Sequence, residues 1–203
     1  MNSVDFSSQN EDIEVRLEKI NKVSNQIYTF RKRIARGLFE IEKLQVLIEN
    51  IYETLKNWTG KNYIGIEKDN RLKKAFQRLF ENLTDFLITC KEVPIAELNE
   101  FAQQALFQGT LYRYLGHTSL VDFNERIEPC YDGVYVSWSK NPQNNYIEDK
   151  LRGTMTLLTC KVSGAYYGID LSVFEVDKGT EAEVVFPTIE STIVNKEYIE
   201  RPY

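Results

Sequence analysis

The feature that most constrains this chain is a long, regular spacing of apolar residues near its N-terminus. Between Ile13 and Leu55, thirteen Ile, Leu, Val and Phe residues follow one another at steps of three or four, a mean spacing of 3.5. That spacing is the heptad value, and it places an apolar stripe along one side of an α-helix. No proline interrupts the pattern, and Gly37 is its only glycine. We therefore expect residues 10–56 to form one long helix or two helices stacked end to end.

Two further helices are expected before the pattern changes. A second apolar stripe, over about Asn70–Thr89, predicts a helix that forms an αα-hairpin with the first one. The segment NWTGKNYIG, with Gly60 and Gly65, breaks the helical pattern between them. Pro94 suits the first turn of a third helix, which we expect to continue to about Phe107.

Beyond Gly109 the pattern becomes typical of strands. Six short stretches, rich in Val, Ile, Thr and Tyr, are bounded by Gly, Asn, Asp or Pro: TLYRYL, GVYVSW, TMTLLTCKV, AYYGIDL, EVVFP and STIVNKEYI. Charge divides the chain as well, because residues 1–95 carry a net +2 and residues 96–203 a net −7. The predicted class is α+β, with a helical module at residues 1–94 and a second domain with a mainly antiparallel sheet at residues 95–203.

Several kinds of function find no support in the sequence. One histidine and three widely spaced cysteines, Cys90, Cys130 and Cys160, match neither a zinc pattern nor a disulfide framework, so no metal is expected. No strand leads into a GxGxxG or P-loop motif. The N-terminus lacks the regions of a signal peptide, and no apolar run approaches the roughly 18 residues that cross a membrane. We expect no membrane partner, and a protein that is cytoplasmic or delivered into a target cell without a cleaved signal peptide.

Three features of the second domain point to chemistry when they are taken together. Arg113 lies within LYRYL, and an arginine in a strand is exposed, paired, or available to an anion such as a phosphate. Ser137 and Ser139 share one face of VYVSWS. Glu181 and Glu183 precede and enter EVVFP, and two carboxylates on one strand face are unfavourable unless solvent or a ligand needs them there. Each feature alone has an ordinary structural explanation, so their order along the chain carries the information.

Together these features resemble the arginine–serine–glutamate class of ADP-ribosyltransferases, the class of many mono-ADP-ribosyltransferase toxins and effectors. That family has an arginine on its first core strand, Ser-x-Ser on a second strand and Glu-x-Glu entering a third. The resemblance covers about residues 109–203, and its most specific part runs from Tyr167 to Pro187. The chain departs from the family pattern at Trp138, where Thr is usual, and at Tyr114, where Gly is common. The resemblance implies a small split β-sandwich of ADP-ribosyltransferase type.

The resemblance also implies a reaction, the transfer of ADP-ribose from NAD⁺ to a macromolecule with release of nicotinamide. NAD⁺ is then a substrate that is consumed, and a protein arginine is the expected acceptor. Cleavage of the nicotinamide–ribose bond passes through an oxocarbenium-like transition state, which Glu183 would stabilise through the ribose 2′-hydroxyl. Glu181 would position or deprotonate the acceptor. Arg113 would bind the NAD⁺ phosphates, since a guanidinium can bond them bidentately.

The resemblance assigns supporting roles to other residues. Ser137 would orient the nicotinamide ribose or the catalytic glutamate, and Ser139 would belong to the same NAD⁺ site. Phe174 resembles the aromatic residue that contacts the target in this family. His117 is an alternative first residue, because a sister class of the family uses His-Tyr-Glu.

Two other functions stay open. One keeps the chemistry but changes the acceptor to a nucleic acid, which would dock on the basic cluster of the long helix, formed by Arg31, Lys32, Arg33 and Arg36. The other is a non-enzymatic interaction protein. Its heptad helices would form a coiled coil that binds a partner or a second copy, attached to a degenerate transferase domain.

Overall fold

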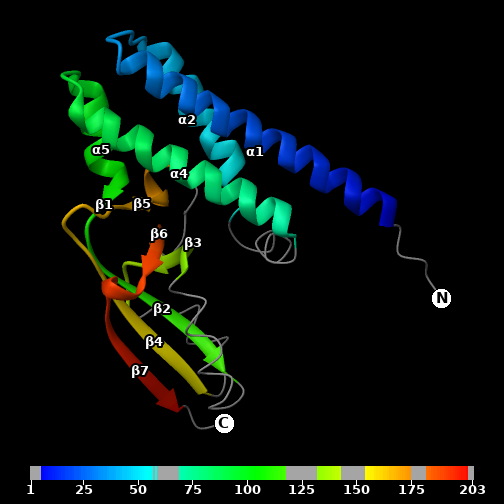
Figure 1. Ribbon diagram of the computed structural model, residues 1–203, viewed down its shortest axis with the longest axis vertical. Helices are drawn as coiled ribbons and strands as arrows, with labels where there is room; N and C mark the ends of the chain where they lie inside the picture. Colours follow the sequence, from blue (N-terminus) through cyan, green and yellow to red (C-terminus); the bar gives the residue numbers. More distant parts are fainter. Residues whose placement is uncertain are drawn as a thin grey trace. The chain divides into compact units, whose positions relative to one another are not determined.

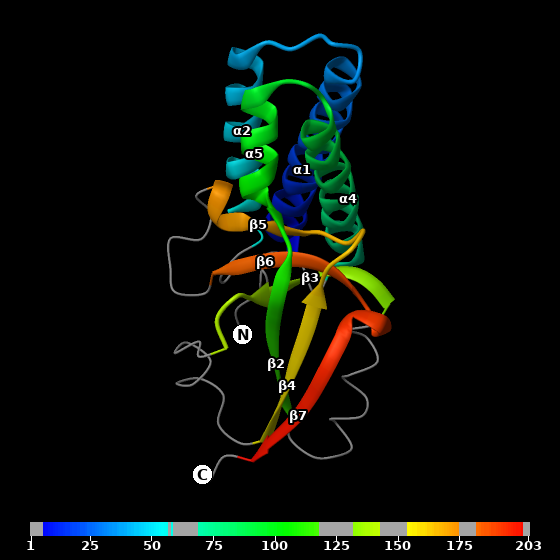
Figure 2. The same ribbon diagram turned by 90° about the vertical axis from the view of Figure 1, so that its left-hand side faces the viewer.

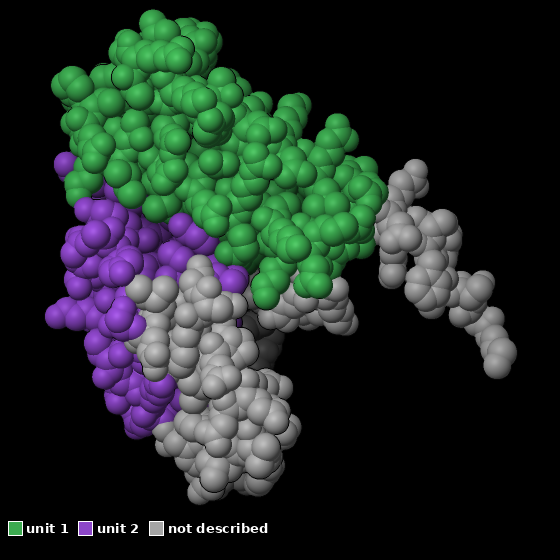
Figure 3. Space-filling view, viewed as in Figure 1, with its two compact units in different colours: residues 1–99 green, residues 100–203 purple. Residues whose placement is uncertain are grey.

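A computed structural model describes most of the chain. The described residues are 6–56, 58, 69–117, 132–142, 154–174 and 182–200. The chain divides into two compact units, Met1–Asn99 and Glu100–Tyr203, which Figure 3 shows in green and purple. We call them the helical unit and the sheet unit. The division lies inside helix α5 (Ala96–Ala105), a few residues after the boundary at 94/95 that composition suggested.

The helical unit is built on α1 (Phe6–Ile34), α2 (Ile41–Leu55) and α4 (Asn70–Glu92), and α5 begins in it. Helix α1 packs along α4 (Figure 1). The apolar stripes of both helices meet there, and the rings of Phe30 and Phe86 are edge to face with 5.9 Å between centroids. A partly buried polar contact joins the same helices, because Asn82 donates a hydrogen bond to the hydroxyl of Ser24 at 2.8 Å.

The apolar stripe does not form one rod, so the expectation of one long helix, or of two helices stacked end to end, is wrong. Helix α2 folds back against α1 in the antiparallel sense, and Asn50 donates a hydrogen bond to Gln26 across the pair. The cause is Gly37, whose φ of 75° lies in the left-handed region. Gly37 N bonds Ile34 O at 2.9 Å and Leu38 N bonds Arg33 O at 3.0 Å, which is the pattern of a Schellman C-cap.

Helix α4 begins where the sequence predicts a helix, and its start has a clear physical basis. Asp69 is the N-cap, and its carboxylate accepts hydrogen bonds from the backbone N–H groups of Arg71 and Leu72 at 2.8 and 3.2 Å. The hydrogen bond from the Arg71 side chain, with the two backbone bonds, holds the pKa of Asp69 below its usual value. No helix among the described residues is long and apolar enough to cross a membrane.

The sheet unit contains one curled antiparallel sheet with the strand order β1-β5-β6-β3-β2-β4-β7. The strands are β1 (Leu106–Phe107), β2 (Gly109–His117), β3 (Asp132–Ser139), β4 (Thr154–Val162), β5 (Gly168–Asp170), β6 (Glu183–Ile189) and β7 (Ile193–Glu200). Each of the six predicted stretches contains a strand, and the α+β class is confirmed. Strand β1 was expected to be the end of the third helix, but it leaves that helix to pair with β5.

The curl of the sheet is concentrated between β2 and β3. Strand β2 pairs with β4 along its whole length, from Gly109 to His117, whereas it pairs with β3 only through Tyr112 and Ser139. As a result, β2, β4 and β7 run together while β3, β6 and β5 run across them (Figures 1 and 2). The apolar core of the curl contains seven buried residues, namely Leu111, Trp138, Leu158, Cys160, Val162, Val184 and Phe186.

Candidate active site

The strand order brings together the three residues that the sequence resemblance singled out. Strands β6, β3 and β2 are consecutive in the sheet, and they carry Glu183, Ser137 and Arg113 respectively. A guanidinium N–H of Arg113 (Nη1) donates a hydrogen bond to the backbone carbonyl of Ser137. The hydroxyl of Ser137 in turn donates to Oε1 of Glu183. A continuous chain of hydrogen bonds therefore runs from Arg113 through Ser137 to Glu183. The first pair is separated by 24 positions in the sequence and the second by 46.

The polar groups of this cluster are largely removed from water. Glu183 is only 7% exposed, and Arg113 and Ser137 are half-buried. The Nε of Arg113 is buried and has no hydrogen-bond partner within the described part of the chain. Burying an unsatisfied donor costs free energy, about 1–3 kcal/mol. Such a donor, linked through Ser137 to a buried carboxylate, is suited to a ligand that carries an anionic group and a hydroxyl group.

Ser139 lies beside this cluster, but its hydroxyl serves the end of β3. It is opposite Glu183 in the β3–β6 register and is itself buried. Its Oγ lies 3.0 Å from both the backbone N and the backbone O of Asn141. The structure thus brings Ser139 to the site while its hydroxyl fixes the turn that follows the strand.

An ion pair that the sequence did not indicate spans the strand that carries Glu183. Lys140 Nζ lies 2.7 Å from Oδ2 of Asp170, and Oδ1 of Asp170 accepts hydrogen bonds from the N–H and the hydroxyl of Ser172 at 3.1 and 2.6 Å. Lys140 N also bonds the carbonyl of Ala182 at 3.1 Å. Because β6 lies between β3 and β5, these bonds fasten the start of β6 on both sides.

The residue before Glu183 has an unusual backbone. Ala182 has a φ of 46°, and it is the only described residue other than glycine with a positive φ. The left-handed region costs an alanine about 1–2 kcal/mol. Close packing is needed here too, since a Cβ on Gly168 in β5 would lie 2.5 Å from the Val184 side chain. The sequence signal for the ion pair is Asp170, a charged residue in the otherwise apolar strand Gly168–Asp170.

The remaining predicted residues have different outcomes. Phe174 is 1% exposed and its ring packs edge to face on Phe101, with centroids 5.8 Å apart, so in this structure it is part of the core and not a surface for a target. Glu181 lies outside the described residues. The backbone of His117 lies in β2 opposite Thr154, but its side chain is not among those that the structure describes. Trp138 is buried in the apolar core, and strand alternation points it away from the face of Ser137.

Cysteine chemistry has little support at the described positions. Burial raises the pKa of the Cys90 thiol to about 12, and it also raises the pKa of the Cys160 thiol. A thiol that stays protonated is a poor nucleophile and a poor metal ligand. In the part of the chain that the structure describes, no group of three or more His, Cys, Asp or Glu residues could hold a metal ion.

The basic cluster of α1 is partly neutralised within the helical unit. Arg31 forms an ion pair with Asp85, and Arg33 forms one with Glu40 at 2.7 Å. Lys32 lies over the ring of Tyr28, with Nζ 4.3 Å from the ring centroid, and its hydrogen bond lowers the pKa of that tyrosine. These contacts reduce the free positive charge available to a nucleic acid.

Comparison with protein-family models, with curated proteins and with solved structures gave no match to this chain.

Proposed function

We propose that the sheet unit is an ADP-ribosyltransferase domain of the split β-sandwich type, which transfers ADP-ribose from NAD⁺ to a protein arginine and releases nicotinamide. The observation that carries this proposal is the hydrogen-bonded chain Arg113–Ser137–Glu183 across three consecutive strands. In the family that the sequence resembles these three side chains share one site, so their contact in this chain supports the proposal. The sharp bend between β2 and β3 also suits a sheet that is divided into two parts.

The proposed chemistry starts with the bond between nicotinamide and C1′ of the ribose. As this bond breaks, its electron pair leaves with nicotinamide and positive charge develops on the ribose. The carboxylate of Glu183, hydrogen-bonded to the 2′-hydroxyl, stabilises that charge. Ser137 already holds one carboxylate oxygen, so the group is oriented before the substrate arrives. Little reorganisation is then needed at the moment of reaction.

Arg113 has the properties of a phosphate ligand in this scheme. Its guanidinium is fixed at one end by the Ser137 carbonyl, and its Nε still lacks an acceptor among the described residues. A diphosphate oxygen would satisfy that donor, and bonds between guanidinium and phosphate are among the stronger hydrogen bonds in proteins. Glu181 keeps its proposed role of positioning or deprotonating the acceptor guanidine. The contact with the target is not assigned to Phe174, because that ring is buried.

The test of this proposal is the variant Glu183→Gln with Glu197→Gln as a matched control. Glu197 is an exposed glutamate on β7 of the same unit, so its substitution makes the same chemical change away from the cluster. Hydrolysis of NAD⁺ by Glu183→Gln should fall about 10²–10³-fold, the typical effect of removing one electrostatic stabiliser. The control should keep the wild-type rate. Equal rates in both variants would refute the assignment, as would a folded wild type that never cleaves NAD⁺.

A second experiment distinguishes a protein acceptor from a nucleic-acid acceptor. Labelled NAD⁺ is supplied to a cell lysate with the protein, and the labelled products are digested with protease or with nuclease. Loss of the macromolecular label with protease supports a protein acceptor, and loss with nuclease supports a nucleic acid. A protein that binds through its helices without enzymatic activity would give no label and no free nicotinamide.

A further inference from the structure

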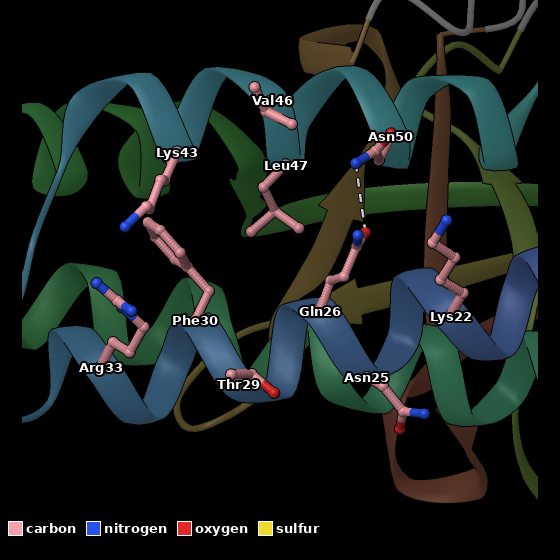
Figure 4. A pocket seen from close by; sticks show the side chains of 10 residues that line it. All are labelled: Lys22, Asn25, Gln26, Thr29, Phe30, Arg33, Lys43, Val46, Leu47 and Asn50. Carbon is pink, nitrogen blue, oxygen red and sulfur yellow. Dashed lines mark hydrogen bonds between the residues drawn. The ribbon is translucent and has the colours of Figure 1, made fainter.

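The helical unit contains an open groove between α1 and α2 (Figure 4). Its volume is about 560 Å³; apolar atoms make up most of the exposed wall, and Asn50 and Gln26 bond across the groove at 3.3 Å. Phe30 and Leu47 form the floor and are nearly buried, while Val46 beside them is 56% exposed. Leu38 and Ile41, at the turn between the two helices, are also exposed. Val46 therefore adds exposed apolar surface to a groove with an apolar floor, a combination found at many interaction sites.

The ends of the groove carry positive charge. Figure 4 shows Arg33 and Lys43 together at one end and Lys22 toward the other. No carboxylate is among the ten residues that line the groove, although the chain as a whole has a net charge of −5. Arg33 and Lys43 share a single carboxylate, that of Glu40 outside the groove.

The cations of the groove are also incompletely satisfied. Lys22 has no ion-pair partner among the described residues, and the Nε of Arg33 is buried without a hydrogen-bond partner there. Arg33 and Lys43 share one carboxylate, and Lys22 has none among the described residues. The groove can therefore accept further acidic groups at both ends. Complementary charge therefore points to an acidic occupant.

The shape of the groove indicates the form of that occupant. Two antiparallel helices with a furrow between them present the kind of surface that accepts a third helix, whose apolar face lies along the furrow. Lys22 and Arg33 are eleven residues apart on α1, which corresponds to about 16 Å along the helix axis. A bound helix of about three turns would bring its own two ends to these cations.

We infer that this groove binds one amphipathic helix of a partner protein, with apolar residues along its middle and carboxylates near both ends. The inference does not depend on the proposed enzymatic function, since it concerns only the helical unit. A second copy of this chain is a less suitable occupant. The helices α1, α2 and α4 each use an apolar face within their own unit.

The test uses the full chain and a dye-labelled synthetic helical peptide of about sixteen residues, long enough to span the groove. The peptide has a leucine stripe with glutamates at both ends, and a second peptide has lysine in place of every glutamate. Fluorescence anisotropy at physiological salt should give saturable binding of the acidic peptide with a Kd of roughly 10⁻⁵ M or tighter. The lysine peptide should bind at least about tenfold more weakly, because its charges oppose those of the groove ends.

Variants of the protein locate the binding. Val46→Glu places a charge on the apolar wall, and Lys22→Glu reverses one end of the groove. Each should weaken binding of the acidic peptide by about tenfold or more. Val15→Glu is the matched control, because Val15 is an exposed valine on α1 outside the groove, 62% accessible. This control should bind as the wild type does. Circular dichroism shows whether each variant is folded, and Lys22→Glu alone is sufficient if Val46→Glu does not fold.

Four results of the binding experiments would overturn the inference. They are no binding of the acidic peptide at millimolar concentration, equal binding of both peptides, no loss in a folded Lys22→Glu, or equal loss in Val15→Glu. Sedimentation of the chain without peptide provides a further check. If the wild type were a dimer that Val46→Glu dissociates, a second copy would be the occupant and the proposed partner helix would be wrong.

Discussion

The two units differ in where their bonded charged side chains lie, mostly at the surface in the helical unit and mostly in the interior in the sheet unit. In the helical unit the ion pairs lie at the surface, and Glu53 with Lys56 and Glu40 with Lys43 are each about half exposed. In the sheet unit Glu183 is buried, and Asp170 is mostly so. Exposed pairs contribute about 0–1 kcal/mol, whereas breaking a buried pair costs several times more. A fold gains little stability from burying such groups, so their concentration near the start of β6 directs attention to function there.

After the loss of hydrolysis in Glu183→Gln, the largest expected effect is on the binding of NAD⁺ through Arg113. Arg113→Ala should weaken NAD⁺ binding by about 30- to 100-fold, as expected when a charge-assisted hydrogen-bond pair is lost, and should lower kcat much less. The reason is that the phosphates lie away from the bond that breaks. Calorimetry measures Kd, and steady-state hydrolysis of NAD⁺ measures kcat.

Arg113→Lys sharpens this test because it keeps the charge but not the planar fork, so it should restore little of the affinity. If kcat collapsed while affinity was unchanged, Arg113 would have another role and the histidine alternative, His117, would need to be examined.

The next largest effect is on the free energy of unfolding, when an ion pair is broken in each unit. Asp170→Ala removes the partner of Lys140 and the acceptor for Ser172, so it should lower the free energy of unfolding by about 2–3 kcal/mol. Glu40→Ala removes a carboxylate that two exposed cations share, and because solvent screens such pairs it should lower the free energy of unfolding several-fold less. Urea unfolding of both variants measures the difference. Equal losses would contradict the contrast between the two units.

The same ion pair can be tested for its effect on Glu183. In Lys140→Met, which removes the charge and keeps most of the length, NAD⁺ hydrolysis should fall by about tenfold at an unchanged KM, because the pair fixes the start of β6 and does not touch the substrate. Lys140→Arg should retain most of the rate. A rate that stayed at the wild-type value in Lys140→Met would show that the pair serves stability alone.

A smaller effect, with a defined pH dependence, is expected at the N-cap of α4. Asp69→Ala should lower stability by about 1 kcal/mol at neutral pH, through the loss of the bonds to Arg71 N and Leu72 N. Since the pKa of Asp69 is lowered in the folded state, its contribution is present above the unfolded value near 4. It is lost as the pH falls through the lower folded value.

Asp69→Asn distinguishes the cap from the charge. Asparagine is also a good N-cap, so this variant should keep most of the stability at neutral pH and lose less of it on acidification. Urea unfolding at pH 7 and pH 3 makes the comparison. An acid transition identical to that of the wild type would show that the charge of Asp69 does not matter.

The sequence predicted some parts of this molecule well, for reasons that depend on distance along the chain. Strand positions and the start of α4 follow from local composition and capping, so short windows were sufficient. The sequence did not predict that α2 turns back after Gly37, because the heptad spacing continues through the turn. Leu38 and Ile41 keep that spacing, yet both are exposed in the structure. Local spacing cannot tell whether an apolar residue meets a partner.

The candidate site shows the same limit. The types and order of Arg113, Ser137 and Glu183 were visible in the sequence, because the motifs that carry them are short. Their contact depends on the pairing of β3 with both β2 and β6, which no local pattern states. The pair Lys140–Asp170 was missed for the same reason, since Lys140 directly follows β3 and Asp170 ends β5, on the two sides of β6. Burial of Phe174 depends equally on its distant neighbour Phe101.

The smallest predicted effect is on stability, at one residue with a left-handed backbone in each unit. Gly37 and Ala182 both have positive φ, but only alanine pays the steric cost of its Cβ. Gly37→Ala should therefore cost about 1 kcal/mol, although the structure has open space at that position. Ala182→Gly should change stability by less than about 1 kcal/mol, because relief of strain is offset by the greater chain entropy of glycine in the unfolded state.

Activity gives the second measurement on Ala182→Gly. If the left-handed residue serves only to complete the turn into β6, NAD⁺ hydrolysis should be unchanged within about twofold, because glycine adopts the same φ without strain. A fall of tenfold or more at unchanged stability would mean that the alanine side chain helps to fix Glu183. The strained residue would then belong to the active site, and the contrast with Gly37, which only ends a helix, would be functional as well as structural.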